Sequence, residues 1–182
     1  NIQKITTPYM RFYELEALCA MGEQPFVLNE MKAYWGGMLQ LGATSFWEEY
    51  NPTKKGAEHY AMYGREFGKS LCHAWGASPI YLLGKYYLGV KPLSAGYATY
   101  EVVPNLGGLQ WMEGKVPTPE GEILLNVNTK QIRITGAAGT GTLKFKSKSK
   151  PVCKEGMVND KGNGNFELTI EKNKTYTVTY KL

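Results

Sequence analysis

The spacing of the apolar residues changes once along this chain, at Lys91-Pro92, and this change most constrains the fold. Before it, apolar side chains recur at intervals of three and four residues, which is typical of α-helices. After it, they alternate in short runs separated by Gly, Pro and Asn, which is typical of β-strands. The sequence therefore predicts an α+β protein in two segregated parts, residues 1–90 and residues 91–182.

Three helical patterns are predicted in the first part. They run from Pro8 to Met21, from Pro25 to Leu41 and from about Ser70 to Leu88. Pro79 interrupts the third pattern, so this helix must either kink there or restart with Ser78 as its cap. The helices are apolar on nearly all sides, and three of them cannot bury that surface alone. We expect them to belong to a larger helical assembly.

The second part contains short alternating segments that predict strands. A further strand opens at Trp111, and Lys172-Asn173-Lys174 is expected to form a hairpin turn between the last two strands. Regular spacing of such segments predicts an antiparallel β-sandwich. The segments are residues 97–104, 122–127, 131–135, 141–146, 166–170 and 175–180.

The net charge of +5 comes entirely from residues 91–182, which suggests nucleic acid or an anionic polysaccharide as a possible partner. The lysines of residues 144–150, however, alternate with small or apolar residues. That pattern indicates a strand with one solvated face that runs into a loop, so no nucleic-acid partner is expected. No apolar run is long enough to span a membrane.

The cysteines Cys19, Cys72 and Cys153 are odd in number and lack short spacings, so they predict neither a disulfide framework nor a zinc cluster. Cys19 and Cys72 lie in helical patterns and are expected to be small core residues. The chain opens on Asn1 without an initiator Met or a signal peptide. We therefore expect a piece of a longer protein, whose compartment (periplasm, exterior or cytoplasm) stays open.

Two short segments concentrate the reactive side chains. The first contains Trp47, Glu48 and Glu49, and the second contains His73 and Trp75. Carboxylates serve as acid and base in glycoside hydrolysis, while aromatic rings cover the apolar faces of a bound sugar. These segments are therefore the candidate functional site.

Each of these residues also has a structural interpretation. Most glutamates are solvated, and indoles or a lone histidine in apolar helices usually belong to the core. For Trp35 we expect only packing, and for Trp111 packing between the sheets. His59 lies in a polar stretch and is expected in an exposed loop.

With these motifs the chain resembles the C-terminal portion of the bacterial α-L-rhamnosidases of glycoside hydrolase family 78. The resemblance covers roughly residues 5–125. The Gly-Ala-Thr-x-x-Trp-Glu element is specific when the histidine segment and the Gly-x-x-Pro exit follow in order. The matching segments are Thr7-Pro8-Tyr9, Gly42-Ala43-Thr44-Ser45-Phe46-Trp47-Glu48, Cys72-His73-Ala74-Trp75, Gly89-Val90-Lys91-Pro92, Gly96-Tyr97 and Val103-Pro104.

The resemblance implies a catalytic (α/α)6 toroid followed by a C-terminal β-sandwich. Residues 1–90 would be the last helices of the toroid and residues 91–182 the sandwich. It also implies hydrolysis of terminal α-L-rhamnosides with inversion, without a metal or cofactor. The implied partners are a rhamnose-containing oligosaccharide or glycoside and the remainder of the chain's own catalytic domain.

Carried over by position, Glu48 matches the general base of the family and His73 a histidine that hydrogen-bonds the sugar. Trp47 and Trp75 are candidate platforms beneath the sugar. Glu49 is the alternative base, but the family glutamate directly follows the tryptophan. The family's general acid lies earlier in the toroid, and nothing here matches its acidic cluster, so this chain alone is expected to be inactive.

Two other functions stay open. The β-rich part could be a non-catalytic carbohydrate-binding module if Tyr97, Tyr100, Tyr176 and Tyr180 formed an exposed aromatic stripe. Alternatively, the chain could end another (α/α)6 glycosidase with a different sugar specificity. The natural glycoside, the aglycone and the oligomeric state are not set by these residues.

Overall fold

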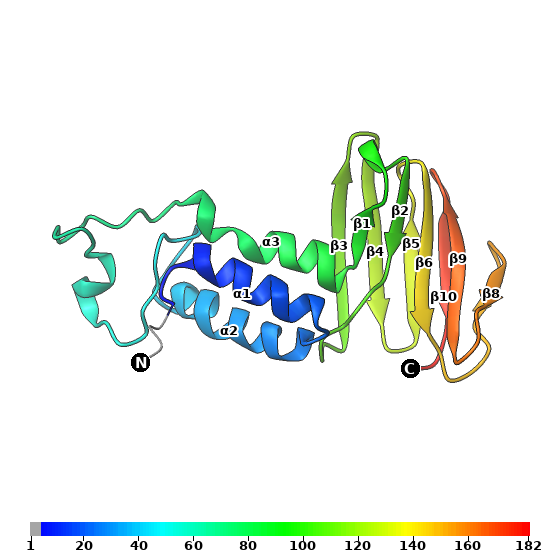
Figure 1. The fold of residues 1–182 in the computed structure, drawn as a ribbon, viewed down its shortest axis with the longest axis horizontal. Helices are drawn as coiled ribbons and strands as arrows, with labels where there is room; N and C mark the ends of the chain where they lie inside the picture. The colour runs from blue at the N-terminus through cyan, green and yellow to red at the C-terminus, as the bar shows by residue number, and fades with distance from the viewer. Residues whose placement is uncertain (1–4) are drawn as a thin grey trace. The chain divides into compact units, whose positions relative to one another are not determined.

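The structure is a computed structural model that describes residues 5–182. The chain divides into two compact units, one ending at Leu82 and one beginning at Leu83 (Figure 1). The first is helical and the second consists mainly of strands. The predicted α+β class with segregated parts is therefore confirmed.

Two long helices form the framework of the first unit, α1 (Pro8–Ala20) and α2 (Gln24–Gln40). Both agree with the predicted helical patterns. Arg11 on α1 joins them through an ion pair of 2.8 Å with Glu30 on α2. Apolar side chains complete the core of this unit, among them Leu15, Val27, Met31, Trp35 and Met38.

The third predicted helix is wrong in its first half. Residues 70–77 contain only a short 3-10 turn, η2 (Ala74–Gly76), and another such turn, η1 (Gly56–Tyr60), lies earlier in the loop. The α-helix α3 (Ser78–Leu82) begins at Ser78, directly before Pro79, and the π-helical turn η3 (Leu83–Tyr87) follows in sequence. Proline suits the first helical turn because it lacks the N–H that would be unpaired there. The restart at Pro79 is therefore the alternative that the structure adopts.

The second unit contains two five-stranded sheets, ordered β1-β2-β6-β9-β8 and β3-β4-β5-β10-β7. Their strands are β1 (Val90–Pro92), β2 (Thr99–Val102), β3 (Trp111–Thr118), β4 (Gly121–Asn128), β5 (Gln131–Thr135), β6 (Thr140–Lys146), β7 (Val152–Cys153), β8 (Val158–Asp160), β9 (Asn165–Glu171) and β10 (Thr175–Thr179). All pairs are antiparallel except β2 and β6, which are parallel. The first sheet is therefore mixed, which corrects the expectation of purely antiparallel sheets.

Alternating side chains of the two sheets meet in a shared core. Buried side chains come from both sheets, for example Leu143 and Leu168 from one and Ile132 and Ile134 from the other. The rings of Phe145 in β6 and Tyr180 after β10 lie 5.7 Å apart, centroid to centroid. Along β6 the apolar residues are buried while the lysines between them are partly or fully exposed, as the sequence predicts.

Two expectations for the β-rich part are wrong. Residues 172–174 do not form a hairpin, because β9 and β10 belong to different sheets and this turn carries the chain from one sheet to the other. Alternation predicts a strand but not its partner, so the sequence could not distinguish these two connections. Trp111 opens β3 but is 64% exposed, since Met112 takes the buried side of this edge strand.

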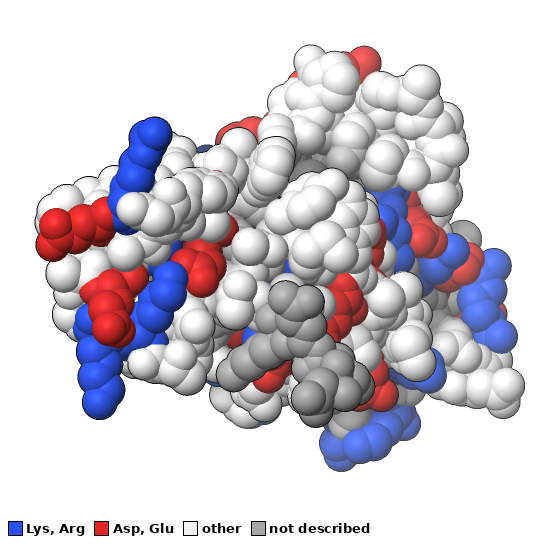
Figure 2. Space-filling view, turned by 60° about the vertical axis from the view of Figure 1, so that its left-hand side comes forward, with Lys and Arg blue, Asp and Glu red and all other residues white. Residues whose placement is uncertain are grey.

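Some of the basic side chains of the second unit form ion pairs with carboxylates at the surface. Lys144 binds Glu101 at 3.1 Å and Lys172 binds Glu120 at 2.8 Å. On the face that Figure 2 draws, basic and acidic side chains lie beside one another. None of the helices within residues 5–182 has the length and apolar character that crossing a membrane requires.

Candidate active site

Helix α2 anchors both segments that carry the candidate site residues. The Tyr34 hydroxyl accepts a hydrogen bond of 3.1 Å from the Tyr50 amide, and the Tyr50 ring packs against Gly37, where a side chain would collide with it. One helical position further, the Trp35 indole N–H donates to the Gly76 carbonyl at 2.8 Å. The two segments are therefore fixed to neighbouring positions of the same helix.

Backbone hydrogen bonds then pair the two segments with each other. The Glu48 amide donates to the Ser70 carbonyl at 3.0 Å, and the His73 amide donates to the Phe46 carbonyl at 2.8 Å. These bonds use the backbone groups that a helix through residues 70–77 would need. Glu48 and His73, far apart in sequence, consequently lie on paired segments.

Glu48 is partly exposed, and its carboxylate is held at both oxygens. Oε1 accepts a hydrogen bond from the Tyr63 hydroxyl, and Oε2 accepts one of 3.0 Å from the Ser70 amide. The Tyr63 hydrogen bond is the main reason that the pKa of Glu48 is lowered, with a second contribution from Ser70 and smaller ones from His73 and Lys69. Glu48 is therefore ionised at neutral pH and able to accept a proton.

Glu49 has a different environment although it is the next residue. It is only 9% exposed, and its Oε2 lies 2.8 Å from Lys54 Nζ and 3.2 Å from Lys69 Nζ. Burial is the largest single influence and raises the pKa of Glu49, but the two ammonium groups together outweigh it and the pKa is lowered. Glu49 is thus engaged in an internal ion pair with Lys69, whose side chain is 0% exposed.

The two tryptophans of the candidate site also differ. Trp75 is 62% exposed; its ring lies 5.1 Å from the His73 imidazole and 4.9 Å from the Tyr9 ring. Trp47 is 3% exposed, packs against Tyr60 and has no open ring face of comparable size. Only Trp75 offers an indole surface beside the imidazole.

Two further expectations for this unit need correction. Cys72 is exposed rather than a core residue, because its segment is a loop and not a helix. His59 is buried rather than exposed, because its ring stacks on Tyr50 with centroids 6.2 Å apart. The expected packing roles of Cys19 and Trp35 are confirmed, since both are buried.

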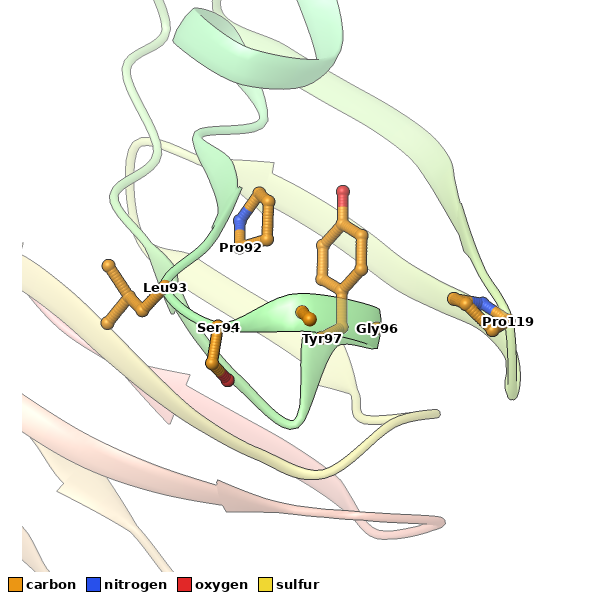
Figure 3. A pocket seen from close by; sticks show the side chains of 7 residues that line it. Pro92, Leu93, Ser94, Gly96, Tyr97 and Pro119 are labelled. Carbon is orange, nitrogen blue, oxygen red and sulfur yellow. The ribbon is translucent and has the colours of Figure 1, made fainter.

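The tyrosines of the second unit do not form an exposed stripe. Tyr100, Tyr176 and Tyr180 are buried between the sheets. Tyr97 lines a shallow hollow of about 480 Å³ (Figure 3). The other residues of this hollow are Pro92, Leu93, Ser94, Ala95, Gly96 and Pro119.

Sequence reasoning missed three residues that surround Glu48, namely Tyr63, Lys69 and Ser70. The pair Tyr63-Gly64 signals a turn, but nothing in the sequence shows that this turn reaches back to residue 48. Within residues 5–182, no three His, Cys, Asp or Glu side chains are grouped so that they could hold a metal ion.

Glycoside hydrolases use a pair of carboxyl groups, and an ionised, partly exposed carboxylate such as Glu48 has the chemistry of one member of such a pair. In keeping with this class, the chain is similar to the GH78 family rhamnosidase of Bacillus sp. GL1, with 35% identity over 67% of this chain and a TM-score of 0.56. It also resembles the α-L-rhamnosidase of Streptomyces avermitilis complexed with L-rhamnose, with 13% identity over 81% of this chain and a TM-score of 0.63. The α-L-rhamnosidase of Dictyoglumus thermophilum gives 19% identity over 81% of this chain and a TM-score of 0.59.

These likenesses confirm the resemblance to the α-L-rhamnosidases of family 78 that the motifs indicate. The chain spans only 12%, 15% and 17% of the three proteins, so it corresponds to a small portion of such an enzyme. The two matches of low identity support the fold alone. Neither a protein-family model nor a curated protein matches the chain.

Proposed function

We propose that this chain is the C-terminal part of an inverting glycoside hydrolase that removes terminal α-L-rhamnose from glycosides, with Glu48 as its general base. The observation that carries the proposal is the contrast between two adjacent carboxylates. Glu48 is ionised and partly open, whereas Glu49 is buried between two lysines. The similarity to family 78 rhamnosidases supports the choice of sugar.

In this mechanism Glu48 removes a proton from water while the water oxygen attacks the anomeric carbon. Each oxygen of Glu48 accepts one hydrogen bond and keeps a lone pair for this proton. A carboxylic acid on the opposite side of the sugar, about 6.5–9.5 Å away, protonates the leaving oxygen. We assign that acid to polypeptide outside this chain.

His73 and Trp75 would bind the sugar. The imidazole can donate or accept a hydrogen bond with a sugar hydroxyl, and the exposed indole can cover an apolar sugar face. Trp47 is buried, so its role would be to support the loop that carries Glu48 rather than to contact the sugar.

The helical unit would supply the last helices of an (α/α)6 toroid, and the β-rich unit the C-terminal β-sandwich. The exposed apolar surface of the helices supports this assignment, because the other helices of a toroid would cover it. The exposed side chains include Tyr9, Met10, Tyr13, Phe26, Leu39 and Ile80.

The test is a comparison of variants in the full-length protein. Glu48→Gln should lower the turnover of an aryl α-L-rhamnoside by about 10²–10⁴-fold, while calorimetry shows that rhamnose still binds. Glu49→Gln, in the fraction that folds, should keep turnover near the parental level. Parental turnover in Glu48→Gln would refute the base assignment, and faster turnover of another aryl glycoside would favour a different sugar specificity.

The hollow at Tyr97 supports a second candidate, a carbohydrate-binding module. This function requires that the chain binds a plant polysaccharide and that Tyr97→Ala abolishes the binding. Calorimetric titration of both forms separates the candidates, because a rhamnosidase end piece needs no such binding. The burial of three of the four tyrosines makes this the weaker candidate.

A further inference from the structure

Tyr63 lies at the tip of a tight turn that faces Glu48. Met62 and Arg65 pair across the turn through two backbone hydrogen bonds of 3.0 Å each. The two residues between them have positive φ angles, 55° at Tyr63 and 71° at Gly64. Such turns favour Asn-Gly, since both positions are left-handed.

Tyrosine is a poor choice for this position on backbone grounds. A bulky side chain at positive φ is a conformational outlier, and such strain persists only where the surroundings maintain it. Burial does not hold the ring in place, because Tyr63 is 71% exposed. The side-chain hydrogen bond that the structure gives Tyr63 is to Glu48 Oε1.

The other oxygen of Glu48 is held by a rigid partner. The Ser70 amide donates to Oε2, while the Ser70 carbonyl accepts from the amide of Glu48 itself. The carboxylate therefore lies between a fixed backbone amide and a phenol that a strained turn presents. Without the phenol, the carboxylate would be held by the Ser70 amide alone, and its orientation would be less restricted.

We infer that Tyr63 is a positioning residue for Glu48, whose hydroxyl fixes the orientation of the carboxylate for proton abstraction. This inference rests on the proposed function of Glu48 as a general base. The hydrogen bond from the Tyr63 hydroxyl also favours the ionised form of the Glu48 carboxylate. Loss of this bond should therefore weaken both the orientation and the ionisation of the base.

The first experiment measures the Glu48 carboxyl in the chain itself. The pH titration of its ¹³C resonance, identified by its absence in Glu48→Gln, gives the pKa directly. In Tyr63→Phe this pKa should rise relative to the unmodified chain. Tyr13→Phe is the matched control, because Tyr13 is also exposed and its hydroxyl bonds to Tyr9 instead. An unchanged Glu48 pKa in Tyr63→Phe would overturn the inference.

The second experiment measures turnover in the full-length enzyme. Tyr63→Phe should lower kcat by about ten- to a hundredfold with little change in KM. The acidic limb of the pH profile of kcat should move to higher pH. Tyr63→Asn places a residue that favours positive φ in the turn and removes the phenol. This variant should keep or raise the melting temperature and still lose activity.

These outcomes separate the two proposals. Full turnover in Glu48→Gln would refute the proposed function. Loss of turnover in Glu48→Gln together with parental kcat and an unshifted pH profile in Tyr63→Phe would refute only the inference. A Tyr63→Asn variant as active as the parent would refute it equally.

Discussion

At the scale of single residues, buried and partly exposed side chains alternate along the loop that carries Glu48 and Glu49. This alternation explains why the two carboxylates have different roles. From Trp47 to Tyr50 every second residue is buried, so Trp47 and Glu49 face inward while Glu48 and Tyr50 are partly open. This is the alternation of an extended chain, not of a helix. Backbone geometry thus assigns the ion pair to Glu49 and leaves Glu48 accessible.

Replacing Glu49 should destabilise the chain, since Lys69 would stay buried without its partner. We expect Glu49→Gln to lower the free energy of unfolding by about 3 kcal/mol, the cost of leaving a buried charge uncompensated. Urea denaturation measures the change. Glu66→Gln is the control, because Glu66 is exposed and should change stability by less than about 0.5 kcal/mol. Equal effects of the two substitutions would contradict the importance of the ion pair.

The lowered pKa of Glu49 also predicts how the stability of the chain depends on pH. Because the folded-state pKa of Glu49 is lowered, its stabilisation is complete above its ordinary value of 4.5. It is lost as the pH falls below 4.5 through the lower folded-state value. The stability difference between the unmodified chain and Glu49→Gln should therefore shrink below this pH. Urea midpoints recorded at neutral and acidic pH test this, and a constant difference would disprove it.

At the scale of elements, two adjacent glycines of α2 offer a direct test of how the loops are anchored. A Cβ at Gly37 would lie 2.3 Å from the Tyr50 ring, whereas a Cβ at Gly36 meets nothing within 4 Å. Gly37→Ala should destabilise the chain by about 1–3 kcal/mol through this collision. Gly36→Ala should stabilise it by about 0.5–1 kcal/mol, because alanine is the better helix former. Thermal unfolding of both variants tests these predictions. If the melting temperature changed in the same direction in both variants, Tyr50 would not pack against Gly37.

Elements with a long and regular pattern could be predicted from the sequence. The periods of α1 and α2 and the alternation of β5 predict these elements closely. The short strands β1, β7 and β8 have too few residues to show a period. The apolar character of residues 70–77 indicated a helix, but their backbone groups bond the Glu48 loop instead. Tertiary pairing of this kind overrides local propensity.

The candidate site could be predicted only in part, because a local pattern reveals its segments but not their contacts. The segments with Glu48 and His73 stand out by composition, and the structure pairs them. The contacts of Glu48 with Tyr63 and of Glu49 with Lys69 join residues far apart in sequence. No local pattern encodes such contacts, so only the folded chain reveals them.

At the scale of the whole molecule, the two units bury their apolar residues to different extents. Among the described residues, large exposed hydrophobic side chains outnumber the buried ones in the helical unit, while the reverse holds in the β-rich unit. Buried apolar area contributes roughly 25 cal/mol per Å², so the β-rich unit should be the more stable of the two. An intact rhamnosidase would supply further surface to the helices.

This difference predicts that heat unfolds the helical unit first. Three of the four tryptophans, Trp35, Trp47 and Trp75, belong to that unit, and the fourth, Trp111, is exposed on β3. Substitution of an exposed residue should cost little, so in Trp111→Phe the tryptophan fluorescence reports on the helical unit alone. Its melting transition should precede the loss of β-sheet circular dichroism. Coincident transitions would instead mean that the chain unfolds in one cooperative step. In that case the exposed apolar surface would not make the helical unit less stable than the β-rich unit.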